Sequence, residues 1–251
     1  MLLAVAAAFA FDPVLETFSE GVVDWTNFRL VVHASSSGAT GAMNNVESAE
    51  GDARAQLEPR IERLARAVRI DRERSAGALL DVADAVSDRL ERSLTYWEVY
   101  EARYLSTGGV ELDAALSLQR WLRPAMVTMA TTRERPAVLG GASGLLVDAR
   151  HLEVECALSP EFMDTTGSHL YGIADMTLHA ASQRQPVVYV QDPADPVAAR
   201  RAGLTPVLLR PERVQSGTDL VFGVEAAAAL KALGDTSEVL RNGTVVVVVS
   251  P

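Results

Sequence analysis

The spacing of apolar residues changes twice along the first half of the chain, and this change restricts the folds that it can adopt. Residues 26–33 (TNFRLVVH) alternate, as expected of a strand with one buried face. From 46 to 68 apolar residues recur every three or four positions, and a second such stripe spans 76–94, so two amphipathic helices follow. We expect Pro59 to kink the first helix or to begin a new one.

A hairpin is predicted after these helices. Residues 96–105 alternate again and residues 110–122 return, with Gly108 and Gly109 in the turn between them. Glycine supplies the positive φ that tight hairpin turns need. A strand, a helix pair and a hairpin predict an α+β unit over residues 22–130, with an antiparallel sheet that carries the helix pair on one face.

The second half reads as a smaller mixed α/β unit. Residues 131–143 (TTRERPAVLGGAS) are first polar and then glycine-rich, which predicts a linker. Residues 144–251 contain several short apolar runs separated by turn signals, an alanine-rich helix at 224–233 and the run 244–249 (TVVVVV). An all-apolar strand of this kind is expected at the centre of a sheet, buried on both faces.

The N-terminal segment, residues 1–21, resembles an export signal followed by a short lead. Met1–Ala10 (MLLAVAAAFA) is apolar and ends in an A-x-A pattern, so we expect cleavage before Phe11. The run is shorter than the roughly 20 residues that span a bilayer, and no basic residue precedes it. A buried first helix is the alternative. No cysteine follows the run to accept a lipid, so the sequence predicts a periplasmic or outer-membrane-associated protein without a direct lipid anchor.

Composition excludes several functions. The net charge of -10 argues against nucleic-acid binding, which needs a basic face. One cysteine, Cys156, excludes an internal disulfide and a multi-cysteine zinc site. The glycine-bearing stretches lack the spacing of dinucleotide, phosphate-loop and nucleophile-elbow motifs. We therefore expect no cofactor and no catalytic activity.

A polar cluster between Asp148 and Cys156 leaves one alternative open. If the segment is extended, His151, Glu153 and Glu155 share one face, and imidazole and carboxylates together can bind a metal. Alternation also groups polar residues on any solvated strand face, and we prefer that interpretation. The alternative function is an enzyme or metal-binding protein that uses this cluster.

Three tyrosines mark a candidate interface on the first strand of the hairpin. Tyr96, Tyr100 and Tyr104 are expected on one face and Trp97 on the other. Either the tyrosine face packs on the helices, or it binds a protein partner or a second copy, because tyrosine is enriched at interfaces.

The order of elements and several short motifs resemble bacterial envelope proteins related to flagellar assembly proteins P and T, which include small outer-membrane lipoproteins. The matching motifs are Asp24-Trp25-Thr26, Ala53–Gln56 (ARAQ), Gly144–Arg150 (GLLVDAR), Ala157–Pro160 (ALSP) and Gly167–Gly172 (GSHLYG). The chain departs from this pattern at His151, where the family has glycine, and in lacking the lipid-accepting cysteine. The resemblance implies a non-catalytic structural or assembly role in the envelope, in a surface appendage or at the outer membrane.

Overall fold

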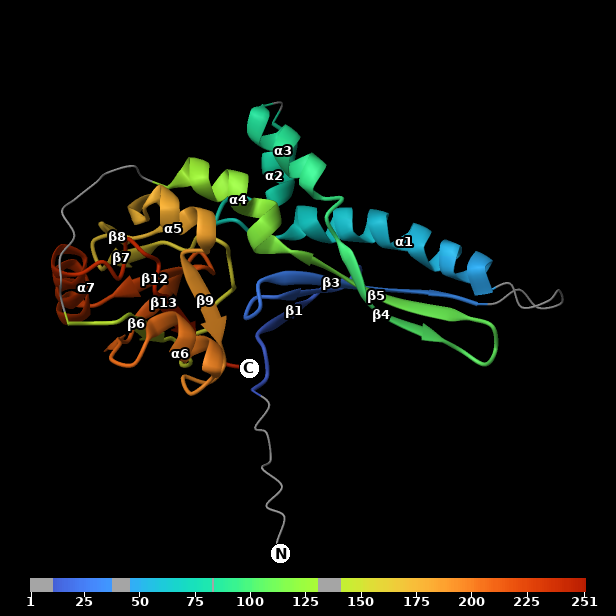
Figure 1. The fold of residues 1–251 in the computed structure, drawn as a ribbon. Helices are drawn as coiled ribbons and strands as arrows, with labels where there is room; N and C mark the ends of the chain where they lie inside the picture. The colour runs from blue at the N-terminus through green and yellow to red at the C-terminus, as the bar shows by residue number, and fades with distance from the viewer. Residues whose placement is uncertain (1–10, 38–45, 83, 131–140) are drawn as a thin grey trace, which may run out of the picture.

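The first unit is built on a five-stranded antiparallel sheet. The computed structural model describes residues 11–37, 46–82, 84–130 and 141–251 (Figure 1). The strand order is β1-β2-β3-β5-β4. The strands are β1 (Leu15–Thr17), β2 (Val22–Asp24), β3 (Arg29–Ser36), β4 (Glu98–Tyr104) and β5 (Val110–Ser117). The predicted α+β class is confirmed. Residues 1–10 and most of the predicted linker, residues 131–140, lie outside the described part of the chain.

Helices cover one face of this sheet. α1 (Val46–Ala67) packs against β3 and β5, and α4 (Leu118–Met129) packs against the same two strands. The alternating residues Leu30, Val32 and Ala34 of β3 are fully buried beneath them. Figure 1 shows α1 and the distal parts of β3, β4 and β5 extending away from the second unit. None of the described helices is long and apolar enough to cross a membrane.

The helices differ from the prediction in two places. α1 continues through Pro59 as a single helix, because the i−4 residue Ala55 and Pro59 both lie on the exposed face, where water can satisfy the freed carbonyl. The second predicted helix is divided into α2 (Ala76–Leu80) and α3 (Ala85–Ser93). α3 begins where the side chain of Asp84 accepts hydrogen bonds from two backbone N–H groups, an N-cap that starts a new helix.

The returning strand of the hairpin is shorter than predicted. β5 ends at Ser117, whose hydroxyl accepts the N–H of Arg120 and caps α4. Residues 118–122, predicted as strand, therefore open a helix that contains Pro124. The N-cap Ser117 therefore begins a helix within a segment whose apolar residues alternate as they would in a strand.

The sheet begins before residue 22, where the first unit was predicted to start. β1 lies within the predicted lead segment and pairs antiparallel with β2, in the register Leu15 to Asp24. Trp25, directly after β2, is buried and donates its indole N–H to Glu16 of β1 at 2.9 Å.

The second unit contains two four-stranded sheets. The parallel sheet has the order β10-β6-β13-β9, and the mixed sheet has the order β11-β12-β7-β8. The strands of the parallel sheet are β6 (Leu145–Asp148), β9 (Val187–Val190), β10 (Val207–Leu209) and β13 (Val245–Val248). Those of the mixed sheet are β7 (Phe162–Asp164), β8 (His169–Tyr171), β11 (Arg213–Gln215) and β12 (Asp219–Phe222). The helices are η1 (Ile173–Asp175), α5 (Leu178–Gln183), α6 (Pro196–Ala202) and α7 (Val224–Thr236). The prediction that the valine run is a central, doubly buried strand is confirmed by β13.

The two units share one hydrophobic core. Trp25 of the first unit lies edge-on to Tyr189 of β9, with ring centroids 6.0 Å apart. The hydroxyl of Thr26 donates to the carbonyl of Tyr189 at 2.7 Å, and α4 packs against α5. Apolar residues from both units therefore form a continuous cluster, which fixes the two sheets relative to each other.

Candidate functional site

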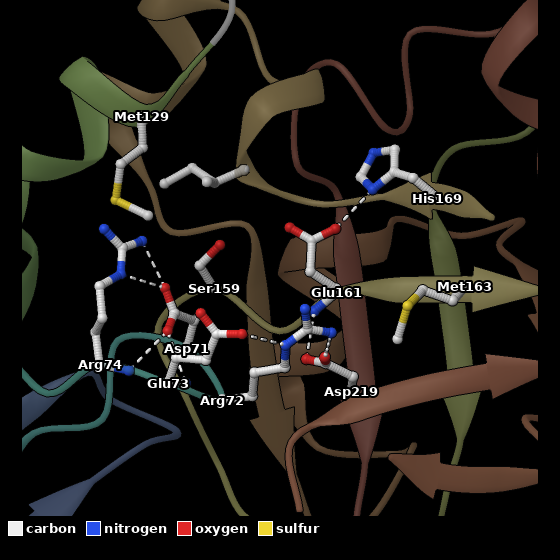
Figure 2. A pocket seen from close by; sticks show the side chains of 11 residues that line it. Asp71, Arg72, Glu73, Arg74, Met129, Ser159, Glu161, Met163, His169 and Asp219 are labelled. Carbon is white, nitrogen blue, oxygen red and sulfur yellow. Dashed lines mark hydrogen bonds and ion pairs between the residues drawn. The ribbon is translucent and has the colours of Figure 1, made fainter. Parts of the chain in front are cut away.

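A cavity of about 290 Å³ lies where the two units meet (Figure 2). The first unit contributes a charged turn at residues 71–74 and Met129 at the end of α4. The second unit contributes residues of β7, β8, η1 and β12 and of the loop that precedes β7. This volume is at the lower end of the range for small-molecule sites. The cavity is the candidate site because polar side chains of both units converge on it.

The turn at 71–74 is held by its first residue. Asp71 accepts the backbone N–H groups of Glu73 and Arg74 at 2.9 and 2.8 Å, which is a side-chain-to-backbone turn typical of aspartate. The guanidinium of Arg74 also bonds to the Asp71 carboxylate. These bonds direct the intervening Arg72 toward the second unit.

Arg72 binds a buried carboxylate. Its Nη1 donates to Oδ2 of Asp219 at 3.1 Å, and its Nε donates to Glu73 at 3.2 Å. The Asp219 side chain has no exposed surface, and its other oxygen accepts from Thr218 and from the N–H of Glu161. Because all of these donors are in place, the carboxylate can be buried without an unsatisfied charge.

His169 lies between two carboxylates at the other side of the cavity. Its Nδ1 is 2.6 Å from Glu161 and its Nε2 is 2.7 Å from Asp175. These hydrogen bonds, the one to Asp175 first, raise the pKa of His169 to about 10 although burial opposes the shift. A β-carbon at residue 172 would lie 2.5 Å from Oε1 of Glu161, so Gly172 allows this carboxylate to rest against the backbone. The imidazole is thus held as a cation at neutral pH.

Ser159 lies in the middle of the cavity wall (Figure 2). The residue is 2% exposed, and its backbone N–H donates to the carbonyl of Ile70 at 2.7 Å. Its hydroxyl makes no hydrogen bond to any residue that the structure describes. The cavity lining also includes three apolar side chains, those of Met129, Met163 and Ile173.

The structure does not bring the predicted metal candidates together. Nε2 of His151 donates to the carbonyl of Pro211 at 3.0 Å, and its Nδ1 accepts from Arg210, so both ring nitrogens are occupied. Glu153 is exposed, and Glu155 pairs with Arg69 at 3.4 Å. Residues 151–157 form a turn and irregular backbone, so the shared strand face does not exist. Within the described ranges, no group of three or more histidine, cysteine, aspartate or glutamate side chains is arranged to hold a metal.

The two ends of that cluster have structural partners. Asp148 forms a two-point ion pair with Arg150, which lowers the pKa of Asp148 to about 2. Burial raises the pKa of the Cys156 thiol, so the thiolate needed for nucleophilic chemistry is disfavoured.

The three candidate interface tyrosines are all exposed, at 51% for Tyr96, 54% for Tyr100 and 57% for Tyr104. The prediction that they share one face is wrong. The register of β4 shifts between Val99 and Glu101, so Tyr100 is the extra residue of a β-bulge that interrupts the alternation.

Each of these tyrosines has its own surroundings. The ring of Tyr96 lies 4.5 Å from the guanidinium of Arg120 on α4. The hydroxyl of Tyr104 donates to Glu50 of α1 at 3.0 Å. Tyr100 and Tyr104 lie on β4 and Tyr96 precedes it, so the three side chains do not form one stripe.

Sequence reasoning did not identify the cavity. The part of the cavity that belongs to the first unit is marked in the sequence only by the charged tetrapeptide of residues 71–74, between two predicted helices. Such a tetrapeptide is too short and too common to indicate a site. No spacing rule connects it with Asp219, 147 residues away from Arg72.

The comparison with protein families concerns the second unit. Residues 144–251 match the family model of the second domain of the Treponema pallidum protein Tp0624. No curated protein matches the chain. The second unit is thus similar to a domain of a bacterial protein. The matched range contains the cavity residues Ser159, Glu161, His169 and Asp219, whereas the turn at 71–74 lies outside it.

Proposed function

We propose that the protein is a non-catalytic structural or assembly component of a bacterial envelope, and that it binds a protein partner along the β4 edge. The observation that carries this proposal is the position of three exposed tyrosines at an edge strand. Tyr100 and Tyr104 belong to β4, and Tyr96 lies two residues before it. β4 pairs with β5 on one side only, and the sheet ends there. Tyrosine presents a large apolar ring together with a polar hydroxyl, which suits a binding surface that is exposed to water before the partner binds.

The chemistry of the β4 edge favours contact between side chains over simple strand addition. The bulge between Val99 and Glu101 disturbs the row of free backbone groups, and the exposed Glu98 and Glu101 add charge. Bulges and charges on an edge discourage non-specific strand pairing. A partner that recognises the tyrosines specifically is compatible with these features.

The state of the titratable groups supports a role without catalysis. His169 is held as a cation between two carboxylates, and His151 uses both ring nitrogens in hydrogen bonds. The Cys156 thiol is buried. A general base or a nucleophile needs a group that can change its protonation state near working pH. The raised pKa values of His169 and Cys156 do not meet that requirement.

The motifs behind the flagellar P and T resemblance have structural roles in this chain. Asp148 and Arg150 pair after β6. Asp164 accepts the N–H groups of Thr166 and Ser168 in the turn from β7 to β8, and the hydroxyl of Tyr171 donates to the carbonyl of Pro186 at 2.9 Å. The resemblance supports an envelope role, and the Ala8-Phe9-Ala10 pattern supports export.

Location and contact can be tested in one strain. Cells are separated into cytosol, periplasm and envelope, and the intact mass of the protein is measured in each fraction. The proposal expects a chain that starts at Phe11, in the periplasm or envelope. A full-length chain confined to the cytosol would contradict it.

Contact is tested by placing a photoreactive phenylalanine analogue at Tyr100 or Tyr104. The matched control carries the same analogue at Gln183, which is exposed on α5 of the second unit. The proposal expects a discrete protein adduct at both tyrosine positions, with the same partner identified by mass spectrometry, and none at Gln183. Equal labelling at all three positions overturns the β4 assignment.

A further inference from the structure

The cavity between the units has an excess of negative charge. Its lining includes four carboxylates, those of Asp71, Glu73, Glu161 and Asp219. A fifth, Asp175, bonds to the far nitrogen of the lining residue His169. They face three cationic side chains, Arg72, Arg74 and His169.

Every cation at the cavity is already paired, and two of them are paired twice. Arg72 bonds to both Asp219 and Glu73, and His169 lies between Glu161 and Asp175. An incoming anion would meet these carboxylates without an unpaired cation to receive it. An incoming cation would be attracted by the surplus of carboxylates.

Two acceptors in the cavity have capacity that no described residue uses. Ser159 is 2% exposed, and its hydroxyl lines the cavity without a hydrogen-bond partner among the described residues (Figure 2). Oε2 of Glu161 accepts from His169, whereas Oε1 receives no hydrogen bond from the described residues. A ligand that carries hydrogen-bond donors can therefore bond to both oxygens.

The remaining walls are aliphatic or sulfur-bearing. Met129, Met163 and Ile173 supply the apolar part of the cavity lining, and unbranched methionine side chains adapt to a flexible apolar chain. We propose that this cavity binds a primary ammonium group on an aliphatic stem, as carried by a lysine side chain or by a free alkyl diamine. The ammonium donates to Ser159 and Glu161, and the stem contacts the two methionines and Ile173.

Isothermal titration calorimetry of the full chain tests this assignment with three probes. Nα-acetyl-lysine amide carries the side-chain ammonium on a peptide-like frame. 1,5-Diaminopentane carries an ammonium on an aliphatic chain without a peptide frame. N-acetyl-norleucine amide has a similar aliphatic stem without the charge. We expect the lysine compound to bind and the norleucine compound not to bind. If the diamine binds as well, the site takes free amines; if it does not, the site requires the peptide frame and takes a protein side chain.

Matched variants assign the binding to the cavity. Ser159→Ala should weaken the lysine compound about fivefold, the effect of one lost hydrogen bond, and Glu161→Gln about tenfold or more. Ser106→Ala, at the exposed tip of the β4–β5 hairpin, should leave the affinity unchanged. Thermal unfolding of each variant shows whether the fold is retained. Ser159→Ala keeps the test valid if Glu161→Gln does not fold.

Several outcomes overturn the assignment. These are equal binding of the norleucine compound, binding of acetate or phosphate in place of the amines, no binding of any amine, or unchanged affinity in Ser159→Ala. The cavity and the β4 edge lie in different parts of the molecule. A failure of this test therefore leaves the proposed envelope role untouched, and the crosslinking test does not depend on amine binding.

Discussion

Nη1 of Arg72 lies 3.1 Å from Oδ2 of Asp219 and joins the turn after α1 to β12 of the second unit. One partner is fully buried and the other is partly exposed. The pair also positions the cavity, because Asp219 binds the backbone N–H of Glu161 through its second oxygen. The same carboxylate thus orients residues from both units.

Replacing Asp219 by alanine should destabilise the protein by about 3 kcal/mol. The change removes a fully buried carboxylate and leaves the partly buried Arg72 and the N–H of Glu161 without this acceptor. Urea denaturation measures the loss. Glu73→Ala removes the other, exposed partner of Arg72 and should change stability by less than about 0.5 kcal/mol. Similar losses of stability in the two variants would show that the buried pair contributes no more than the exposed pair.

His169 should remain protonated at pH 8 in the folded protein. Its folded pKa is raised from 6.5 to about 10. The stabilisation from its two carboxylate partners is therefore fully present below pH 6.5 and is lost as the pH rises toward 10. Imidazole nitrogen shifts in NMR report the protonation state. The stability difference between the native protein and His169→Asn should shrink across the same range, and a difference independent of pH would contradict the assignment.

Gly144→Ala should destabilise the second unit by about 2 kcal/mol. An added β-carbon would lie 2.4 Å from the Cα and the carbonyl oxygen of Ala202 at the end of α6, and these backbone atoms cannot move aside cheaply. Gly51→Ala is the matched control. It lies on the exposed face of α1 with no atom within 4 Å of the added carbon, and should stabilise by about 0.5 kcal/mol or more. Thermal unfolding compares the two, and a neutral Gly144→Ala would mean that α6 is free to shift.

Tyr100→Ser and Tyr104→Ser together should abolish partner or self-association without unfolding the chain. Both rings are more than half exposed, so little apolar area is lost from the core. Sedimentation velocity of the protein alone measures self-association, and the same experiment with the partner identified by photocrosslinking measures partner binding. Circular dichroism measures folding. A loss of cooperative unfolding would place these tyrosines in the core and contradict their exposure.

Local periodicity predicted the elements whose burial repeats along the chain. α1 buries Ala49, Ala53 and Leu57 at helical spacing, and the β4–β5 hairpin has its turn at the predicted glycines. Predictions were wrong where one side chain changes the backbone conformation. Asp84 and Ser117 each cap a new helix inside an apolar pattern that continues without a visible break. The spacing of apolar residues indicates which face is buried. It does not indicate where a side chain caps the backbone and begins a helix.

The predicted site residues also show what local sequence patterns can and cannot predict. The sequence supplied the exposed tyrosines but not the bulge between Val99 and Glu101, because a register shift depends on the partner strand. It grouped His151, Glu153 and Glu155 as if extended, whereas the segment turns after β6 so that His151 can bond to Pro211.

The α+β class, the long helix and the central valine strand could be predicted from local sequence, because each follows from the pattern of its own apolar residues. The cavity could not, because it depends on how distant segments pack together. Arg72 and Asp219 meet because the core shared by both units, around Trp25 and Tyr189, brings the turn after α1 against β12. Charges so distant in sequence become neighbours only when apolar burial elsewhere fixes the distance between the elements that carry them.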